Sequence, residues 1–134
     1  MSKLLKDKNH MCFACSPKNP IGLKLVFEHE GDICRASFVA GPEHQGWNGV
    51  MHGGLLTTIL DEVMAQWLWI RERSAMTAEM TTRFVNPVPL GVKLTIESRL
   101  VADKRRLFLM EATAMLPDGS VAAKATAKFV PAKI

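Results

Sequence analysis

Two glycines and one acid form the part of the sequence whose spacing could do chemistry. Gly53 and Gly54 open an apolar, helix-like stretch, and Asp61 lies inside it among Leu, Ile, Val, Met and Trp residues. Glycine has no Cβ, so a ligand oxygen can approach the backbone closely, and the first N–H groups of a helix have no intrahelical partner. Such a tip binds an anion or polarises a carbonyl group. A carboxylate in an apolar run is expected to have a partner or a function, because burying an unpaired charge is costly.

The distance between the tip and the acid restricts how they can work together. Asp61 follows Gly53 by eight residues, which corresponds to about 12 Å along a helix axis. One carbonyl group cannot contact both, and the sequence contains a single long helical stretch. Two copies packed antiparallel about a twofold axis would bring the tip of one chain to the acid of the other. The spacing therefore predicts a homodimer with its sites across the interface.

The elements that must position these groups follow from the hydrophobic pattern. Alternating residues predict strands before and after the helix, and Gly, Pro and Asp clusters mark the turns between them. Four strands in series after one helix indicate an α+β fold, with an antiparallel sheet laid against the helix. The strands are expected over 22–29, 33–38, 77–85, 92–101, 107–116 and 121–130, and the helix over 53–71.

Composition narrows the class of protein. The 134 residues are 48% hydrophobic, which suits one domain with a core, and the net charge of +4 suits an anionic ligand. Basic residues are spread out without an aromatic-rich RNA-binding signature, so no nucleic acid partner is expected. Residues 1–11 lack the apolar core of a signal peptide, and no apolar run approaches the roughly 20 residues of a membrane span. We therefore expect a cytoplasmic protein without a membrane partner.

Three cysteines do not make a disulfide framework in a chain of this size, so reduced thiols are expected. Cys12 and Cys15, with His10 just before them, have the spacing of half a zinc site. A closed site needs a fourth ligand and no second Cys-x-x-Cys exists, so no metal is assigned. The simpler interpretation is a turn, held by Pro17 and Pro20, that packs Cys12, Phe13 and Cys15 against the body. This segment is taken as residues 1–20, and a single domain as residues 21–134.

Five short motifs follow one another in a definite order along the chain. From Cys12 to Val130 this order resembles the hotdog-fold acyl-CoA thioesterases of the phenylacetate-pathway (PaaI-like) type. The resemblance implies a sheet wrapped around the long helix, a homodimer that often pairs into tetramers, and hydrolysis of an acyl-CoA thioester without a cofactor. The motifs are Cys12-Phe13-x-Cys15-x4-Pro20-x-Gly22-Leu23, Gln45-Gly46-Trp47, His52-Gly53-Gly54 with an acid nine residues after the histidine, Asn86-Pro87, and Pro117-Asp118-Gly119.

The same resemblance implies roles for the catalytic residues. The motif pattern aligns Asp61, rather than the adjacent Glu62, with the catalytic acid. Asp61 would activate water or attack the thioester carbonyl, and its role as base or nucleophile stays open. Gly53 would supply the N–H that polarises this carbonyl, with His52 shaping the start of the helix. Thr77 matches a position that places a hydroxyl near the attacking water. The structural alternative for Asp61 is an ion pair with an arginine such as Arg83.

Substrate contacts are expected around the tip and on a basic turn. Relatives often carry Gln or Asn six residues before the histidine, where this chain has Gly46, so Gln45 or Asn48 would replace that contact. A basic turn would bind the phosphates of coenzyme A, although charge runs are usually only solvated. The full set of expected substrate-binding residues is Gly54, Gln45, Asn48, Thr77, Arg83, Lys104, Arg105 and Arg106.

Two other functions remain open at this level. A module of the same fold that binds acyl-CoA or an acyl carrier without turnover would need no acid at position 61. A hydratase or dehydratase would place both its histidine and its acid on the helix, whereas here the histidine precedes the helix. The acyl group and the choice between dimer and tetramer are not fixed by the sequence.

Overall fold

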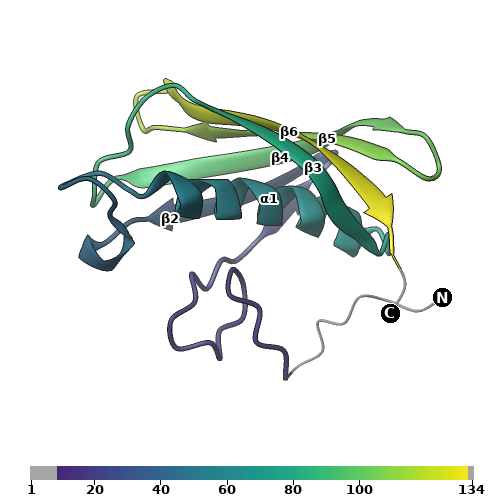
Figure 1. Cartoon of the computed structure of the whole chain (residues 1–134), viewed down its shortest axis with the longest axis horizontal. Helices are drawn as coiled ribbons and strands as arrows, with labels where there is room; N and C mark the ends of the chain where they lie inside the picture. Colours follow the sequence, from purple (N-terminus) through teal and green to yellow (C-terminus); the bar gives the residue numbers. More distant parts are fainter. Residues whose placement is uncertain (1–8, 133–134) are drawn as a thin grey trace.

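An antiparallel sheet of six strands covers one long helix in the computed structural model, which describes residues 9–132 (Figure 1). The strand order is β1-β2-β4-β5-β6-β3, and every neighbouring pair is antiparallel. The expected α+β hotdog arrangement is confirmed. The helix is α1 (Gly53–Ile70), and the strands are β1 (Glu28–Glu30), β2 (Ile33–Val39), β3 (Ala75–Phe84), β4 (Lys93–Asp103), β5 (Phe108–Met115) and β6 (Val121–Pro131).

Helix α1 lies in the core of the domain. Its buried residues recur at helical spacing around a wide arc. The sheet covers one side of this arc, and the N-terminal segment lies on the opposite side of the helix in Figure 1. The buried Ser98 of β4 donates its hydroxyl to the carbonyl of Val63 at 2.7 Å, which fixes the helix to the sheet. The buried helical residues are Leu56, Ile59, Leu60, Val63, Met64, Trp67 and Leu68.

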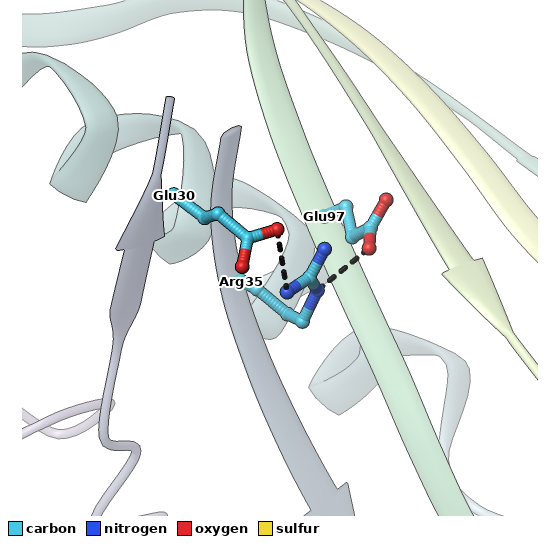
Figure 2. Close-up of polar contacts among 3 residues, drawn as sticks. All are labelled: Glu30, Arg35 and Glu97. Atoms are coloured by element: carbon cyan, nitrogen blue, oxygen red, sulfur yellow. Dashed lines mark hydrogen bonds and ion pairs between the residues drawn. The ribbon is translucent and has the colours of Figure 1, made fainter. Parts of the chain in front are cut away.

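The outer face of the sheet is polar and carries ion pairs between neighbouring strands. Arg35 of β2 donates from Nε to Glu97 of β4 at 2.7 Å, and its Nη1 lies 3.9 Å from the carboxylate of Glu30 on β1 (Figure 2). The hydrogen bond to Glu97, together with the negative charge of that carboxylate, raises the pKa of Arg35. This solvated network leaves the opposite face of the sheet for the helix and the core.

The strand expected over residues 22–29 is wrong for most of its length. Strand β1 contains only Glu28–Glu30. The alternation of Leu23 and Leu25 does reflect burial, but their N–H groups donate to the carbonyls of Phe13 and Ala14 in the N-terminal segment, both at 2.9 Å. Lys24 between them has φ 54°, which a strand does not accommodate.

The N-terminal turn is present from residue 9 onward, whereas residues 1–8 lie outside the described part. Cys12 and Cys15 pack against the core, but Phe13 is 39% exposed, so the expectation that it packs against the body is only partly met. Hydrogen bonds fix the turn, including those from Ser16 N–H to the Cys12 carbonyl and from Gly22 N–H to the Asn19 carbonyl. Within residues 9–132, no helix combines the length and apolar character needed to cross a bilayer.

Candidate active site

The tip of α1 is capped by the histidine that precedes it. His52 has extended backbone angles, φ −61° and ψ 130°, and its Nδ1 accepts the N–H of Gly54 at 2.9 Å. With Nδ1 as acceptor, a neutral imidazole carries its proton on Nε2. His52 therefore holds the start of the helix in place.

Capping leaves one N–H of the first helical turn available. The N–H of Gly54 is bonded to the His52 ring, and those of Leu55 and Leu56 both donate to the His52 carbonyl at 3.1 Å. Among residues 9–132, no hydrogen-bond acceptor pairs with the N–H of Gly53. This N–H is the donor that the helix tip can offer to a ligand oxygen.

The two adjacent glycines meet different neighbours. A Cβ at Gly54 would lie 2.9 Å from Cε1 and 3.0 Å from Nδ1 of His52, which would displace the capping ring. A Cβ at Gly53 would lie 3.4 Å from the ring of Phe84, an ordinary packing distance. Gly54 is thus required by the cap, whereas Gly53 has space beside its available N–H.

Asp61 and Thr77 are brought together between α1 and β3. The hydroxyl of Thr77 donates to Oδ1 of Asp61 at 2.6 Å. A bulge between Thr77 and Glu79 makes this contact possible: Thr77 pairs with the buried Phe129, whereas Glu79 pairs with the exposed Lys128. Without the extra residue, Thr77 and Glu79 would point to the same face of the sheet. The bulge therefore turns the Thr77 hydroxyl toward the helix.

Hydrogen bonds within the loop before the helix fix its conformation. The side-chain carbonyl of Gln45 accepts the N–H of Gly49 at 2.9 Å, and the backbone N–H of Gly46 donates to the carbonyl of Val50, also at 2.9 Å. A Cβ at Gly46 would lie 3.3 Å from both Cα and Cδ2 of His52, so a larger residue there would crowd the cap. Asn48 is exposed on the same loop.

Two other groups of expected substrate contacts lie away from the tip within one chain. Arg83 of β3 is exposed and pairs in register with Lys124, on the face of the sheet that carries Glu79 rather than on the helix side. Lys104, Arg105 and Arg106 form the exposed turn between β4 and β5. This turn lies toward the C-terminal end of α1, opposite Gly53 (Figure 1).

The surface hollow beside β1 lies apart from Asp61 and Gly53. This hollow of about 570 Å³ is lined by Glu30, Asp32, Ile33, Trp67, Arg99 and Leu100, and it contains neither residue. Apolar side chains instead stand exposed near the tip: Phe84 is 55% exposed and Trp47 is 87% exposed. Strand β3, ten residues long, forms one edge of the sheet. A long edge with exposed apolar residues is a surface suited to pairing.

Comparison with known families covers the elements that form this site. The family model described as thioesterase superfamily matches residues 48–123, which include Gly53, Asp61 and Thr77. The chain belongs to the thioesterase superfamily. This membership confirms the family expected from the order of the motifs.

Individual proteins are similar to most of this chain in sequence or in fold. Acyl-coenzyme A thioesterase THEM4 of Bos taurus is 31% identical over 113 residues, which cover 82% of this chain but 46% of that protein. This chain thus spans less than half the length of that relative. The crystal structure of the thioesterase superfamily protein RHA08564 has a TM-score of 0.83 and 27% identity, covering 87% of this chain and 61% of the other. The structure of smu.793 from Streptococcus mutans bound to acetyl CoA has a TM-score of 0.76 and 20% identity, covering 81% and 89%.

Two residues near the candidate site were given no role from the sequence. Phe84 lies against Gly53, and its place on the helix side of β3 depends on the bulge, which the alternation of residues does not reveal. Glu62 follows Asp61 and meets the side chain of Cys12, 50 residues away in sequence. The sequence feature that could have pointed to Glu62 is its position as a second acid in an apolar run.

Proposed function

We propose that this chain hydrolyses an acyl-CoA thioester to a carboxylic acid and coenzyme A. The observation that carries the proposal is one helix that has an available N–H at its tip and, two turns further, an acid held by a hydroxyl. Thioester hydrolysis needs these two groups, because an oxyanion forms on the carbonyl oxygen while water or a carboxylate attacks the carbon. A relative that is named an acyl-coenzyme A thioesterase and a similar fold solved with acetyl CoA support the choice of substrate.

The proposed active unit is a dimer. Gly53 and Asp61 are about 12 Å apart along the helix, too far to act on one carbonyl. An antiparallel partner would place its own Asp61 near Gly53 and generate two equivalent sites. The long edge of β3 and its exposed Met76 and Phe84 supply a surface on which a partner can add its own strand. A pair of such dimers forming a tetramer fits the same proposal.

In the proposed reaction, each group has one task. The N–H of Gly53 donates to the thioester oxygen and stabilises the negative charge that develops there. Asp61 of the partner subunit removes a proton from water as the water oxygen attacks, or attacks directly to form an anhydride that water then cleaves. The C–S bond breaks, and the thiolate of coenzyme A takes up a proton as it leaves. Thr77 orients the Asp61 carboxylate through its hydrogen bond to Oδ1.

The remaining expected contacts are assigned to binding in this proposal. Lys104, Arg105 and Arg106 form an exposed basic turn that suits the phosphates of coenzyme A. Exposed apolar residues near the helix tip, Trp47 and Phe84, suit the acyl group or the partner chain. All three cysteines carry thiols, which supports a reducing compartment such as the cytoplasm.

The variant Asp61→Asn tests the proposal. It keeps an oxygen that can accept from Thr77 but removes the base, so hydrolysis should fall by about 10²–10⁴-fold while coenzyme A still binds. Release of free thiol measures the rate, and titration calorimetry measures binding. Unchanged turnover would remove Asp61 from the mechanism. A single turnover in isotope-labelled water separates the two routes, because label enters the Asp61 carboxylate only if an anhydride forms.

A binding module of the same fold is the alternative. It would bind the same ligand but does not need Asp61, so the Asp61–Thr77 hydrogen bond favours the enzyme. A panel of short, medium, long and aromatic acyl-CoA compounds distinguishes the two functions and also identifies the acyl group. Binding without thiol release across the whole panel would favour the binding module.

A further inference from the structure

Two cysteines and a glutamate from distant parts of the chain meet on the side of α1 away from the sheet. Cys12 and Cys15 come from the N-terminal turn, and Glu62 comes from the middle of the helix. Their two sulfur atoms and one carboxylate oxygen all lie within 4.8 Å of one another, and Cys12 Sγ is 3.6 Å from Glu62 Oε2. Glu62 supplies the third ligand that the Cys-x-x-Cys spacing lacks.

These distances match a tetrahedral zinc ion. With Zn–S near 2.3 Å and Zn–O near 2.0 Å, a tetrahedron places sulfur and oxygen about 3.5 Å apart and two sulfurs about 3.8 Å apart. The observed 3.6 Å from Cys12 to Glu62 therefore requires almost no rearrangement. Thiolate ligands select zinc over magnesium or calcium, which prefer oxygen alone.

The turn that carries the cysteines is already fixed in position. The N–H of Ser16 donates to the Cys12 carbonyl at 3.0 Å, which closes the turn around both thiols. The hydroxyl of Ser16, a residue only 1% exposed, donates to the His10 carbonyl at 2.7 Å. A Cβ at Gly22 would lie 2.7 Å from the Phe13 carbonyl, so the following segment packs tightly against this turn. A preformed loop lowers the cost of ordering the ligands when a metal binds.

We propose that Cys12, Cys15 and Glu62 bind one zinc ion that fastens the N-terminal turn to α1, with water or His10 as the fourth ligand. Consecutive helical residues project about 100° apart. Thr77 holds Asp61 toward β3, whereas Glu62 faces the N-terminal turn, so the metal lies outside the catalytic site. Two thiol protons are released on binding, and the ion stabilises the fold without entering the hydrolysis.

Cobalt(II) titration of the untagged full chain tests this proposal. The protein is first stripped with a chelator and kept reduced with a phosphine. We expect thiolate-to-cobalt charge-transfer absorption that saturates at one ion per chain and is abolished by zinc. Zinc should also raise the thermal midpoint of the stripped protein by mass action.

Matched variants assign the ligands. Cys12→Ser and Cys15→Ser should lose the charge-transfer absorption, and Glu62→Gln should weaken zinc binding at least about tenfold, since even outer-shell changes cost that much. Cys34→Ala, which removes a buried thiol on β2, and Glu28→Gln on β1 should bind as the unmodified chain does. Circular dichroism checks that each variant is folded. The proposal is overturned if the chain gives no charge-transfer absorption, if Glu62→Gln binds normally, or if Cys12 and Cys15 form a disulfide in preference to taking up metal.

Discussion

Replacing Gly53 by proline removes the available N–H while leaving the rest of the helix tip intact. Gly53 is the first helical residue, the position at which proline is best tolerated in a helix. His52 before it has ψ 130°, which is the extended conformation that a following proline requires. No hydrogen bond among residues 9–132 uses the N–H that is lost, and a Cβ at this position meets only Phe84, at 3.4 Å.

We therefore expect a small effect on stability and a large effect on the rate. Gly53→Pro should change the free energy of unfolding by no more than about 1 kcal/mol, because proline restricts the unfolded chain without straining the native one. Loss of one oxyanion donor should lower kcat by about 10²–10³-fold, which corresponds to about 2.7–4 kcal/mol. Gly53→Ala is the matched control, since it adds the same Cβ but keeps the N–H and should retain most of the activity.

The assays are urea unfolding, followed by circular dichroism at fixed protein concentration, and thiol release from the best acyl-CoA of the panel. A fixed concentration matters because dimerisation contributes to apparent stability. Full activity in Gly53→Pro would refute the role of this N–H. An equal loss in Gly53→Ala would show that crowding against Phe84, rather than the missing donor, lowers the rate.

Three further predictions follow from other contacts of the site and the core. Thr77→Val should lower kcat about 10–100-fold, because a hydrogen bond to a charged group contributes about 1.5–3 kcal/mol. Thr77→Ser keeps the hydroxyl and should stay near the original rate. Equal rates for both variants would exclude orientation of Asp61 by the hydroxyl. In the unmodified chain, Gly54→Ala should lower stability because its Cβ displaces the capping ring of His52. In the His52→Ala variant, which has no capping ring, the same substitution should raise stability by about 0.5–1 kcal/mol. Urea titrations of the unmodified chain, the two single variants and the double variant measure this coupling, and additive effects would contradict it. Burial raises the pKa of the Cys34 thiol from 9.0 to about 12, so this thiol ionises at lower pH in the unfolded chain than in the folded one. Stability should therefore fall as the pH rises from about 9 toward 12. The urea midpoint of Cys34→Ala should fall less steeply over this range, and identical pH profiles would argue against the raised pKa.

Local sequence patterns predicted the helix but not the course of the chain before the first strand. The helix was expected over 53–71 and is observed as Gly53–Ile70, because two glycines, the capping His52 and a regular apolar spacing mark its course. The strand expected over 22–29 failed for a physical reason. Alternation reports which side chains are buried, but not that the N–H groups of Leu23 and Leu25 donate to a loop instead of a neighbouring strand.

The motifs predicted a candidate site, and the catalytic roles of its residues stay predictions. The order of the motifs placed Gly53, Asp61 and Thr77 in one site, and the structure brings Asp61 and Thr77 into contact. The bulge in β3 that turns Thr77 inward leaves no mark in the alternation of side chains. The meeting of Glu62 with Cys12 and Cys15 also depends on the path of the N-terminal segment, which no local pattern determines.

The central claim is that each site takes its tip from one chain and its acid from another, and mixing two inactive variants tests it most directly. Asp61→Asn keeps a working tip and Gly53→Pro keeps a working acid, so a dimer of one with the other contains one complete site. Equal amounts unfolded and refolded together should pair at random and recover about a quarter of the original activity. No recovery, in mixtures shown by native mass spectrometry to contain the mixed dimer, would contradict a site shared between chains.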